Sequence, residues 1–321
     1  MPAVFNPAEI RCAVAEIDLV AEMEAGFATY SRGLVDVPPV GELLFPEVRG
    51  EMHVKYGAVR GDGVFVVKIA TGFYGNPEKG LPSSNGAVLV FSARDGSPIA
   101  ILLDEGHLTD IRTAAAGAVV AKYLAPQRLD WIGICGSGTQ ARLQARYLAS
   151  VTRCRNVLVW ARNPERAAEC ASDIVRLGFE VALATSAAAL AERCRLIVTT
   201  TASHEPFLMA HDIRPGTHIT AMGADTPEKT ELDPALLGGA AIVVADSRAQ
   251  CIERGEIHHA LARGEIRADA VVEIGELVDG RRFERRPEDI TIADLTGVAV
   301  QDIVLARAIC RRVGLIDNRL G

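Results

Sequence analysis

The chain has 321 residues, and at roughly 150 residues per domain this length predicts two domains. Its 34 Lys and Arg against 41 Asp and Glu give a net charge of −7, which argues against a protein that binds nucleic acid or an anionic membrane surface. Hydrophobic residues make up 49% and charged residues 23%, so a disordered or fibrous chain is excluded and a globular protein is expected.

Cysteine usage and the N-terminus both bear on the cellular compartment. The seven cysteines are scattered without a CxxC pair, which predicts reduced thiols rather than a zinc ribbon or a disulfide framework. Glu9, Arg11, Glu16 and Asp18 interrupt the first apolar stretch, so no signal peptide is predicted, and no apolar run reaches 18 residues. We therefore expect a soluble, cytoplasmic protein with no membrane partner.

The first part of the chain reads as one helix followed by strands. Apolar residues recur near the helical period over residues 7–32, which predicts a single amphipathic helix. Four strand-like runs follow, at 51–61, 63–73, 86–93 and 97–104. No long helix separates them, so a mostly antiparallel, open sheet is predicted. A helix of small residues from Thr109 ends before Pro126.

Beyond Pro126, strands and helices alternate. A buried strand at 129–135 precedes a helix at 139–150, and a strand at 156–161 precedes a helix that begins near Pro164. Further strands are predicted at 181–185, 195–201, 218–222 and 241–246. This alternation predicts an α/β fold with a parallel, doubly wound sheet, and we place the domain boundary near residue 125. A last helix is predicted at 302–312.

A glycine-rich turn carries the clearest binding signal. Residues 136–141 read G-x-G-x-x-A between a strand and a helix, the context that a dinucleotide-binding turn requires. Glycine lets the backbone approach a pyrophosphate, and the helix N-terminus stabilises its charge. The next strand ends at Arg162 rather than at the Asp or Glu that binds the ribose of NAD. Arg162 suits the 2′-phosphate of NADP, but equally adenine stacking or solvent, so the pattern leaves the cofactor open.

Five segments in the same order resemble the ornithine cyclodeaminase/mu-crystallin family: Lys68 with 80–84, then 108–118, 136–141, 222–232 and 294–302. The resemblance covers nearly the whole chain. It implies a substrate-binding and dimerisation domain at 1–125, joined by a C-terminal helix at about 302–321, and a Rossmann domain at 126–301. It also implies a homodimer, and hydride transfer between a nicotinamide and the α-carbon of a small amino or imino acid.

The resemblance assigns roles to individual residues. Lys68 and Arg112 bind the substrate carboxylate, Asp225 or Lys68 is the catalytic proton donor, and Thr296 lies on the substrate side. The implied cofactor contacts are Ser83, Arg112, Gly136, Gly138, Thr139, Gln140, Arg162, Thr201, Met222 and Lys229. From the residues alone, Lys68 is a cation in an otherwise apolar strand and needs a partner or a ligand. Asp225 is equally well a turn aspartate before Thr226 and Pro227.

The strand that precedes Lys68 points to the type of substrate. Glu51, His53 and Lys55 alternate, so their side chains lie on one face. Residues 38–42 lack the arginine that follows an early proline in the cyclodeaminase and binds ornithine there. Together with Lys68 and Arg112, His53 and Lys55 predict a cation-rich pocket. Such a pocket favours a substrate with a second carboxylate over one with a distal ammonium. An ordinary solvated strand face is the alternative.

These observations predict an NAD(P)H-dependent oxidoreductase that reduces an α-imino acid to an L-amino acid, most simply iminosuccinate to L-aspartate. The alternatives are an ornithine cyclodeaminase-type lyase that recycles NAD, an alanine dehydrogenase or ketimine reductase, and a mu-crystallin-like binding protein. NAD is placed first because the pattern is most similar to iminosuccinate-reducing and ectoine-utilisation members. The adjacent His258 and His259 point to different faces of a helix, so no metal site is predicted.

Overall fold

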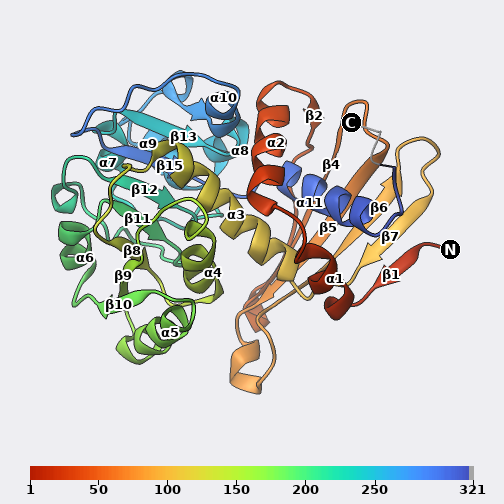
Figure 1. Cartoon of the computed structure of the whole chain (residues 1–321), viewed down its shortest axis with the longest axis horizontal. Coiled ribbons are helices and arrows are strands. Elements are labelled where there is room, and N and C mark those ends of the chain that lie inside the picture. The colour runs from red at the N-terminus through yellow and green to blue at the C-terminus, as the bar shows by residue number, and fades with distance from the viewer. Residues whose placement is uncertain (318–321) are drawn as a thin grey trace. The chain divides into compact units, whose positions relative to one another are not determined.

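The computed structural model describes residues 1–317 of the chain, which form two compact units (Figure 1). Unit 1 comprises Met1–Arg112 and the described residues from Val298 on, and unit 2 comprises Thr113–Gly297. The first division falls inside helix α3 (His107–Leu124), whereas the sequence placed the boundary after this helix. The assignment of the units to substrate and cofactor stays a prediction.

Unit 1 contains a seven-stranded sheet in the order β1-β7-β6-β5-β4-β2, and β3 also pairs with β4. Its strands are β1 (Ala3–Phe5), β2 (Val35–Asp36), β3 (Gly41–Phe45), β4 (Gly50–Val59), β5 (Val64–Phe73), β6 (Ser84–Ser92) and β7 (Pro98–Leu102). Every pairing except that of β1 with β7 is antiparallel, so the predicted mostly antiparallel sheet is confirmed. Strands β4 to β7 were expected from the sequence, and β1 to β3 were not.

The single helix expected over residues 7–32 is wrong. The structure has α1 (Pro7–Val14) and α2 (Leu19–Ser31), because Asp18 adopts an extended backbone and its carboxylate caps the N–H of Ala21. Helix α11 (Ala299–Arg312) contacts α2, β4 and β5, and so belongs to unit 1. Two short 3₁₀ turns complete this unit, at Pro46–Val48 and Asn76–Lys79.

Unit 2 is built on eight parallel strands in the order β10-β9-β8-β11-β12-β15-β13-β14. They are β8 (Ile132–Cys135), β9 (Asn156–Trp160), β10 (Glu180–Leu183), β11 (Leu196–Thr199), β12 (His218–Ala221), β13 (Ile242–Ala245), β14 (Val272–Glu273) and β15 (Thr291–Asp294). The predicted parallel, doubly wound sheet is confirmed. Strand β15 was not expected, although it lies inside the sheet between β12 and β13.

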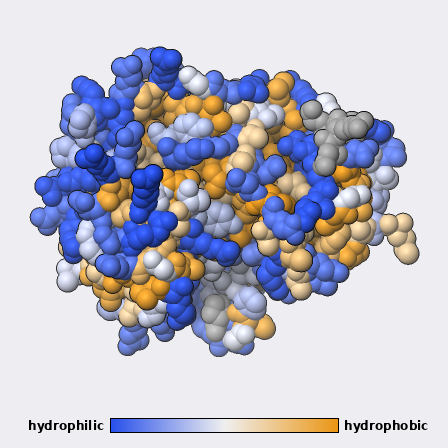
Figure 2. Space-filling view, in the orientation of Figure 1, coloured by the Kyte–Doolittle hydropathy of each residue, from blue (hydrophilic) through white to orange (hydrophobic). Residues whose placement is uncertain are grey.

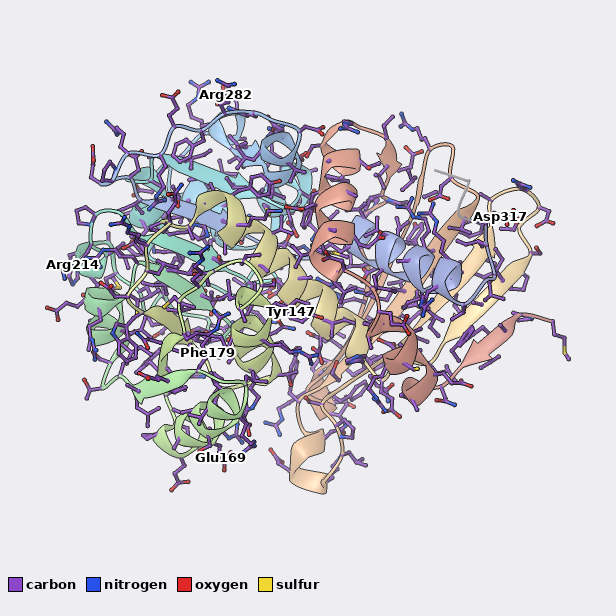
Figure 3. The ribbon with its side chains drawn as sticks, viewed as in Figure 1. Tyr147, Glu169, Phe179, Arg214, Arg282 and Asp317 are labelled. Atoms are coloured by element: carbon purple, nitrogen blue, oxygen red, sulfur yellow. The ribbon has the colours of Figure 1, made fainter. Side chains whose placement is uncertain are left out.

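The helices of unit 2 after α3 are α4 (Thr139–Leu148), α5 (Pro164–Arg176), α6 (Ala187–Arg193), α7 (Pro234–Gly238), α8 (Arg248–Glu253), α9 (Glu256–Ala262) and α10 (Ile274–Val278). Helix α5 shows why they form. Asn163 caps its first turn, Pro164 occupies the first helical position, and Cys170 and Ile174 turn towards the sheet. Glu169 points away from it (Figure 3).

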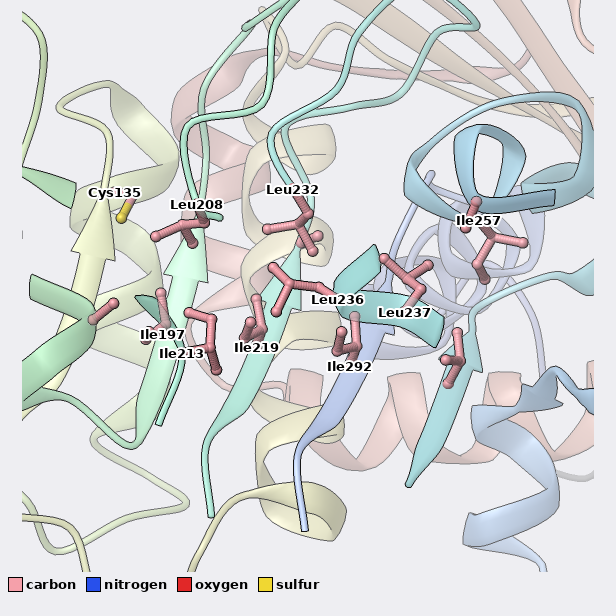
Figure 4. Packing of buried hydrophobic residues seen from close by; sticks show 14 of the residues in the cluster. Cys135, Ile197, Leu208, Ile213, Ile219, Leu232, Leu236, Leu237, Ile257 and Ile292 are labelled. Carbon is pink, nitrogen blue, oxygen red and sulfur yellow. The ribbon is translucent and has the colours of Figure 1, made fainter. Parts of the chain in front are cut away.

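The core of unit 2 packs against this sheet. Ile197, Ile219 and Ile292 are cross-strand neighbours on β11, β12 and β15, and all three are fully buried (Figure 4). Burying each such side chain stabilises the fold by roughly 1.5–3 kcal/mol. On the face in Figure 2, hydrophobic side chains are scattered among hydrophilic ones, as on most protein surfaces.

Across residues 1–317, no helix combines the length and the apolar character that spanning a membrane requires.

Candidate functional site

Lys68 is the buried cation that the sequence singled out, and the structure provides its counter-charge. It lies on β5, where Val64 and Val66 are buried on the same face, and only 2% of the residue is exposed. Its Nζ atom donates a hydrogen bond to Oδ1 of Asp302 at 3.0 Å and is 3.0 Å from Oδ2. Asp302 lies in the first turn of α11 and is itself buried, so this ion pair is shielded from water.

Arg112 joins the same buried pair. Its Nη1 atom donates to Oε1 of Gln301 at 2.9 Å, and its Nε atom is 3.4 Å from Oδ1 of Asp302. Within residues 1–317 that Nε–H has no hydrogen-bond acceptor in good geometry. One carboxylate therefore faces two buried cations, Lys68 and Arg112.

Electrostatics keeps these groups charged near neutral pH. Burial lowers the pKa of Lys68 to about 8, Asp302 acts against this, and Arg112 acts with it. Burial alone would raise the pKa of Asp302, but Lys68, Arg112 and Lys55 together hold it below its usual value. At pH 7 the ammonium is therefore mostly protonated and the carboxylate ionised.

Asp104 is a second buried carboxyl group near Lys68. Its Oδ2 atom accepts a hydrogen bond from the N–H of Leu108 in the first turn of α3, at 2.8 Å. Its Oδ1 atom has no hydrogen-bond partner within the described chain. Burial raises the pKa of Asp104, against the hydrogen bonds and the Lys68 charge that lower it. Asp104 therefore holds its negative charge less firmly than Asp302 does.

Strand β4 brings the predicted pocket cations together in part. Lys55 is directly opposite Lys68 in the antiparallel register, so both side chains are on one face of the sheet. His53 follows on that face, but its ring lies 3.5 Å from a Glu42 oxygen and 3.6 Å from a Glu51 oxygen. The protein itself thus offers His53 two carboxylates, which weakens the case for a substrate carboxylate there.

The glycine turn of unit 2 has the features of a dinucleotide site. It follows β8, whose neighbours β9 and β11 lie on opposite sides, and this switch point is where open α/β sheets bind nucleotides. Gly136 has φ +130°, and a Cβ atom there would lie 2.3 Å from Oγ1 of Thr200. Gly138 precedes α4, and no side chain caps that helix, whereas α5, α6, α7 and α8 each have a side-chain cap. The free first turn of α4, where Thr139 and Gln140 lie, suits a pyrophosphate.

A hollow next to this turn brings several predicted cofactor residues together. Its lining is Gly136, Ser137, Trp160, Ala161, Arg162, Asn163, Arg166, Thr200, Thr201, Ser203 and Phe207. Two of these are arginines and none is acidic. The residues present therefore fit a dinucleotide, and Arg166 is a second cation that the sequence did not single out.

Four further predicted residues of unit 2, Met222, Asp225, Lys229 and Thr296, lie on the segments that follow β12 and β15. Asp225 is exposed, and its Oδ1 atom is 2.7 Å from Nζ of Lys229. Met222 is buried, and its sulfur accepts a hydrogen bond from Gln144. Thr296 is buried, and its hydroxyl accepts from Nε2 of Gln250 at 2.8 Å. Their roles stay predictions.

Ser83 belongs to unit 1, where its carbonyl accepts a hydrogen bond from the N–H of Phe73, and its role as a cofactor contact also stays a prediction.

Sequence reasoning missed Gln301, Asp302 and Asp104 as parts of the site. Gln301 and Asp302 lie at the end of segment 294–302. An amide and an acid among the apolar residues at the start of this helix could have indicated a role for them. Asp104 had no comparable signal, because an aspartate that ends a strand is usually a turn residue.

The two adjacent histidines, His258 and His259, do not act as a pair. The rings of His258 and His259 are edge to face, and each bonds to a different carbonyl, of Ile252 and of Lys229. Over residues 1–317, no group of three or more His, Cys, Asp or Glu side chains is arranged to hold a metal ion.

The fold and the turn define a dinucleotide-binding α/β protein, and comparison with known proteins gives its family. The chain belongs to the ornithine cyclodeaminase/mu-crystallin family, whose model matches residues 3–314. A putative dehydrogenase of Rhizobium meliloti is 41% identical over 98% of this chain and 96% of its own length. The iminosuccinate reductase of Paracoccus denitrificans is 37% identical over 83% of this chain and 84% of its own.

Two solved structures share the fold. The Paracoccus reductase in complex with NAD⁺ superposes with a TM-score of 0.88 at 33% identity, covering 98% of this chain and 96% of that one. An archaeal alanine dehydrogenase dimer with bound NAD has a TM-score of 0.88 at 31% identity, covering 97% and 96%. The predicted family and fold are confirmed, and the NAD bound in these relatives agrees with the cofactor expected.

Proposed function

We propose that this protein is an NAD(H)-dependent imino-acid reductase whose substrate is an α-imino dicarboxylate, most simply iminosuccinate, and whose product is L-aspartate. The observation that carries the proposal is the group of cations in unit 1. Lys68 and Arg112 are buried beside Asp302, and together with Lys55 they hold the pKa of this carboxyl below its usual value. Buried positive charge is costly, and a bound carboxylate would add to the counter-charge that Asp302 provides.

Each cation has a natural role in this reaction. Arg112 carries a planar guanidinium suited to a bidentate grip on the α-carboxylate, with Lys68 beside it. Lys55, opposite Lys68 on the neighbouring strand, is the candidate for the distal carboxylate. His53 is the weaker candidate, because Glu42 and Glu51 already face its ring. A distal ammonium would be repelled by Lys55 and Lys68.

The dinucleotide would be held by unit 2. The first turn of α4 would take the pyrophosphate, and Arg162 and Arg166 of the adjoining hollow would face the adenosine half. Bound there, the nicotinamide would supply the hydride for the imine carbon. NAD is the cofactor of the similar structures described above, and the two arginines extend the same pocket to the 2′-phosphate of NADP.

Reduction of an imine also requires a proton at nitrogen. Lys68 holds one at pH 7, because its pKa is about 8, and a pKa close to the working pH is what a general acid needs. Asp225 is the other candidate, and its ion pair with Lys229 fixes the orientation of its carboxylate. Substitution of each residue in turn, read as a change in the pH dependence of kcat, separates the two donors.

The proposal is tested by NADH oxidation with oxaloacetate and ammonium, which form iminosuccinate in solution. We expect NADH to disappear in proportion to L-aspartate formed, which a chiral separation identifies. Omitting ammonium controls for a contaminating oxaloacetate reductase. No aspartate under these conditions, with the protein folded and NADH bound, would contradict the proposal.

A second candidate is supported by two acidic residues, Glu42 on β3 and Glu51 near the start of β4. Glu42 and Glu51, which flank His53, suit the distal ammonium of a diamino acid such as ornithine. A cyclodeaminase-type reaction would release ammonia from ornithine with only trace NAD and no net NADH. The same protein sample, given ornithine and NAD, decides between the two candidates.

We also propose that the protein is a homodimer that uses strand β3. All five residues of β3 are exposed, among them Leu43, Leu44 and Phe45, on a strand that pairs with β4. An exposed apolar edge strand invites pairing with another chain, and the archaeal relative is a dimer. Native mass spectrometry should give a dimer, and Leu44→Glu should shift it to monomer, with Leu183→Glu, also exposed, as the control. A wild-type monomer would contradict this.

A further inference from the structure

Glu231 is a buried carboxylate with four hydrogen-bond donors, all from unit 2. Its Oε1 atom accepts from the N–H of Thr201 at 2.6 Å and from the hydroxyl of Thr201 at 2.7 Å. Its Oε2 atom accepts from the hydroxyl of Thr199 at 2.6 Å and from the N–H of Gly223 at 2.9 Å. Both oxygens are thus used twice, and the residue is fully buried.

These donors come from the carboxyl ends of two neighbouring strands. Thr199 ends β11 and Thr201 follows it, while Gly223 follows β12. The two segments approach so closely that a Cβ atom on Gly223 would lie 2.1 Å from the carbonyl oxygen of Thr201. Glu231 is therefore the side chain that fixes one segment against the other.

The segments that Glu231 joins carry proposed functional residues. Thr201 lines the nucleotide hollow, Met222 precedes Gly223, and Asp225 lies two residues after it. Glu231 itself touches none of the positions assigned to substrate. The backbone of Glu231 is also fixed, because its N–H donates a hydrogen bond to Oε1 of Glu256 at 2.7 Å.

We propose that Glu231 is a positioning residue for the reaction, which holds Thr201 and segment 222–225 in the arrangement that binds the nicotinamide half of the cofactor and aims Asp225. This rests on the proposed function. Because Glu231 acts through other residues, its removal should weaken cofactor binding and slow turnover while substrate affinity, which depends on unit 1, changes little.

The test is Glu231→Gln, which keeps the shape of the side chain. An amide has one oxygen, so it can accept from Thr201 or from Gly223 but not from both, and its NH₂ group then faces an N–H. A hydrogen bond to a charged group contributes enough that we expect the Kd for NADH to rise and kcat to fall by about tenfold to a hundredfold. The KM for the imino acid should stay within about twofold.

Graded and matched variants separate positioning from general stability. Thr199→Val removes one of the four donors and should shift the Kd in the same direction by less. Ile197→Val, in the same strand, loses core packing without touching Glu231 and should lower Tm while leaving the Kd unchanged. Glu228→Gln makes the same chemical change at an exposed position of the same segment and should have no effect.

NADH binding is followed by the fluorescence of the bound cofactor, so this readout does not depend on turnover. Wild-type Kd and kcat in folded Glu231→Gln would overturn the positioning role. A Kd that rises equally in Ile197→Val would also overturn it, because the effect would then be one of stability. If wild-type protein binds NADH but reduces no imino acid, the proposed function fails, and the Kd comparison still decides the role of Glu231.

Discussion

The two units surround their buried ionisable groups with different partners. In unit 1, Lys68 and Arg112 are buried around Asp302, with Lys55 close by. In unit 2, backbone N–H groups and threonine hydroxyls donate to the buried Glu231 and Glu256. Unit 1 thus sets charge against charge, whereas unit 2 surrounds these two acids with neutral donors.

This difference distinguishes residues that can bind a ligand from residues that position the chain around them. A buried carboxylate with a full set of internal donors has no capacity left for a substrate, so it stabilises and positions the chain around it. The buried guanidinium of Arg112 has such capacity, because its Nε–H has no acceptor in good geometry within the described chain. Substitutions of the unit 1 cations should therefore affect substrate affinity most, and substitutions around Glu231 should affect cofactor binding and turnover.

The largest effect is expected from Arg112→Ala. It removes a buried cation from the proposed carboxylate site, and truncating one partner of such a pair costs about 2–5 kcal/mol. We expect kcat/KM for the imino acid to fall at least about thirtyfold, with the Kd for NADH changed far less. Lys122→Ala, exposed on the same helix, is the control. Near-normal kcat/KM in Arg112→Ala would contradict the proposal that Arg112 binds the substrate carboxylate.

The pH dependence of unit 1 follows from Lys68. Its pKa of about 8 means that the ammonium loses its proton as the pH rises through 8, so kcat/KM for reduction should fall up to tenfold per pH unit above 8. Asp302→Asn removes the charge that raises this pKa, so the falling limb should move to lower pH. A pH–rate profile of both proteins checks this, and a limb that stays in place in the variant would contradict the role of Asp302.

Cofactor choice should respond to the arginines of the nucleotide hollow. Arg162→Ala and Arg166→Ala should each lower kcat/KM with NADPH by about tenfold and leave NADH nearly unaffected, because only NADPH carries a 2′-phosphate for them to bind. Arg176→Ala, exposed at the other end of α5, is the matched control. Equal losses with both cofactors would mean that the arginines do not read the 2′-phosphate.

The last prediction concerns stability rather than activity, in unit 2. Burial, with Glu231 nearby, raises the pKa of Glu256 to about 8 from an ordinary 4.5. The folded protein then binds more protons than the unfolded chain between these values, so this group's contribution to the free energy of unfolding falls as the pH rises from about 4.5 to 8. Urea unfolding of wild type and Glu256→Gln across this range should show a steeper decline in wild type. Parallel curves would contradict the assignment.

Much of the fold could be predicted because its signals are local. The strand, the glycine turn and helix α4 follow one another within twenty residues, and each has its own pattern. Strand β15, Thr291–Asp294, has a polar residue at each end, so it lacks the unbroken apolar run that marks β13. The break between α1 and α2 was hidden because the apolar residues keep a helical spacing across it, although Asp18 marks a helix start.

The sequence identified site residues whose type is unusual at their position, but it did not identify the partners of those residues. A lone lysine in an apolar strand requires a counter-charge, but the sequence cannot say which, and Asp302 lies 234 positions further on. The pairing of His53 with Glu42 likewise depends on the register of β3 against β4, which the sequence did not reveal because β3 itself was not expected. Partners that distant sequence segments supply need the tertiary structure.

The proposal that unit 1 selects a second carboxylate is tested most directly by one ratio. It compares kcat/KM for NADH oxidation with oxaloacetate and ammonium against pyruvate and ammonium, in wild type and in Lys55→Ala. We expect wild type to prefer the dicarboxylate by more than about tenfold, since one charge-assisted contact contributes that much, and Lys55→Ala to lose most of the preference. Equal or better use of pyruvate by wild type, or a preference that Lys55→Ala leaves intact, would contradict it.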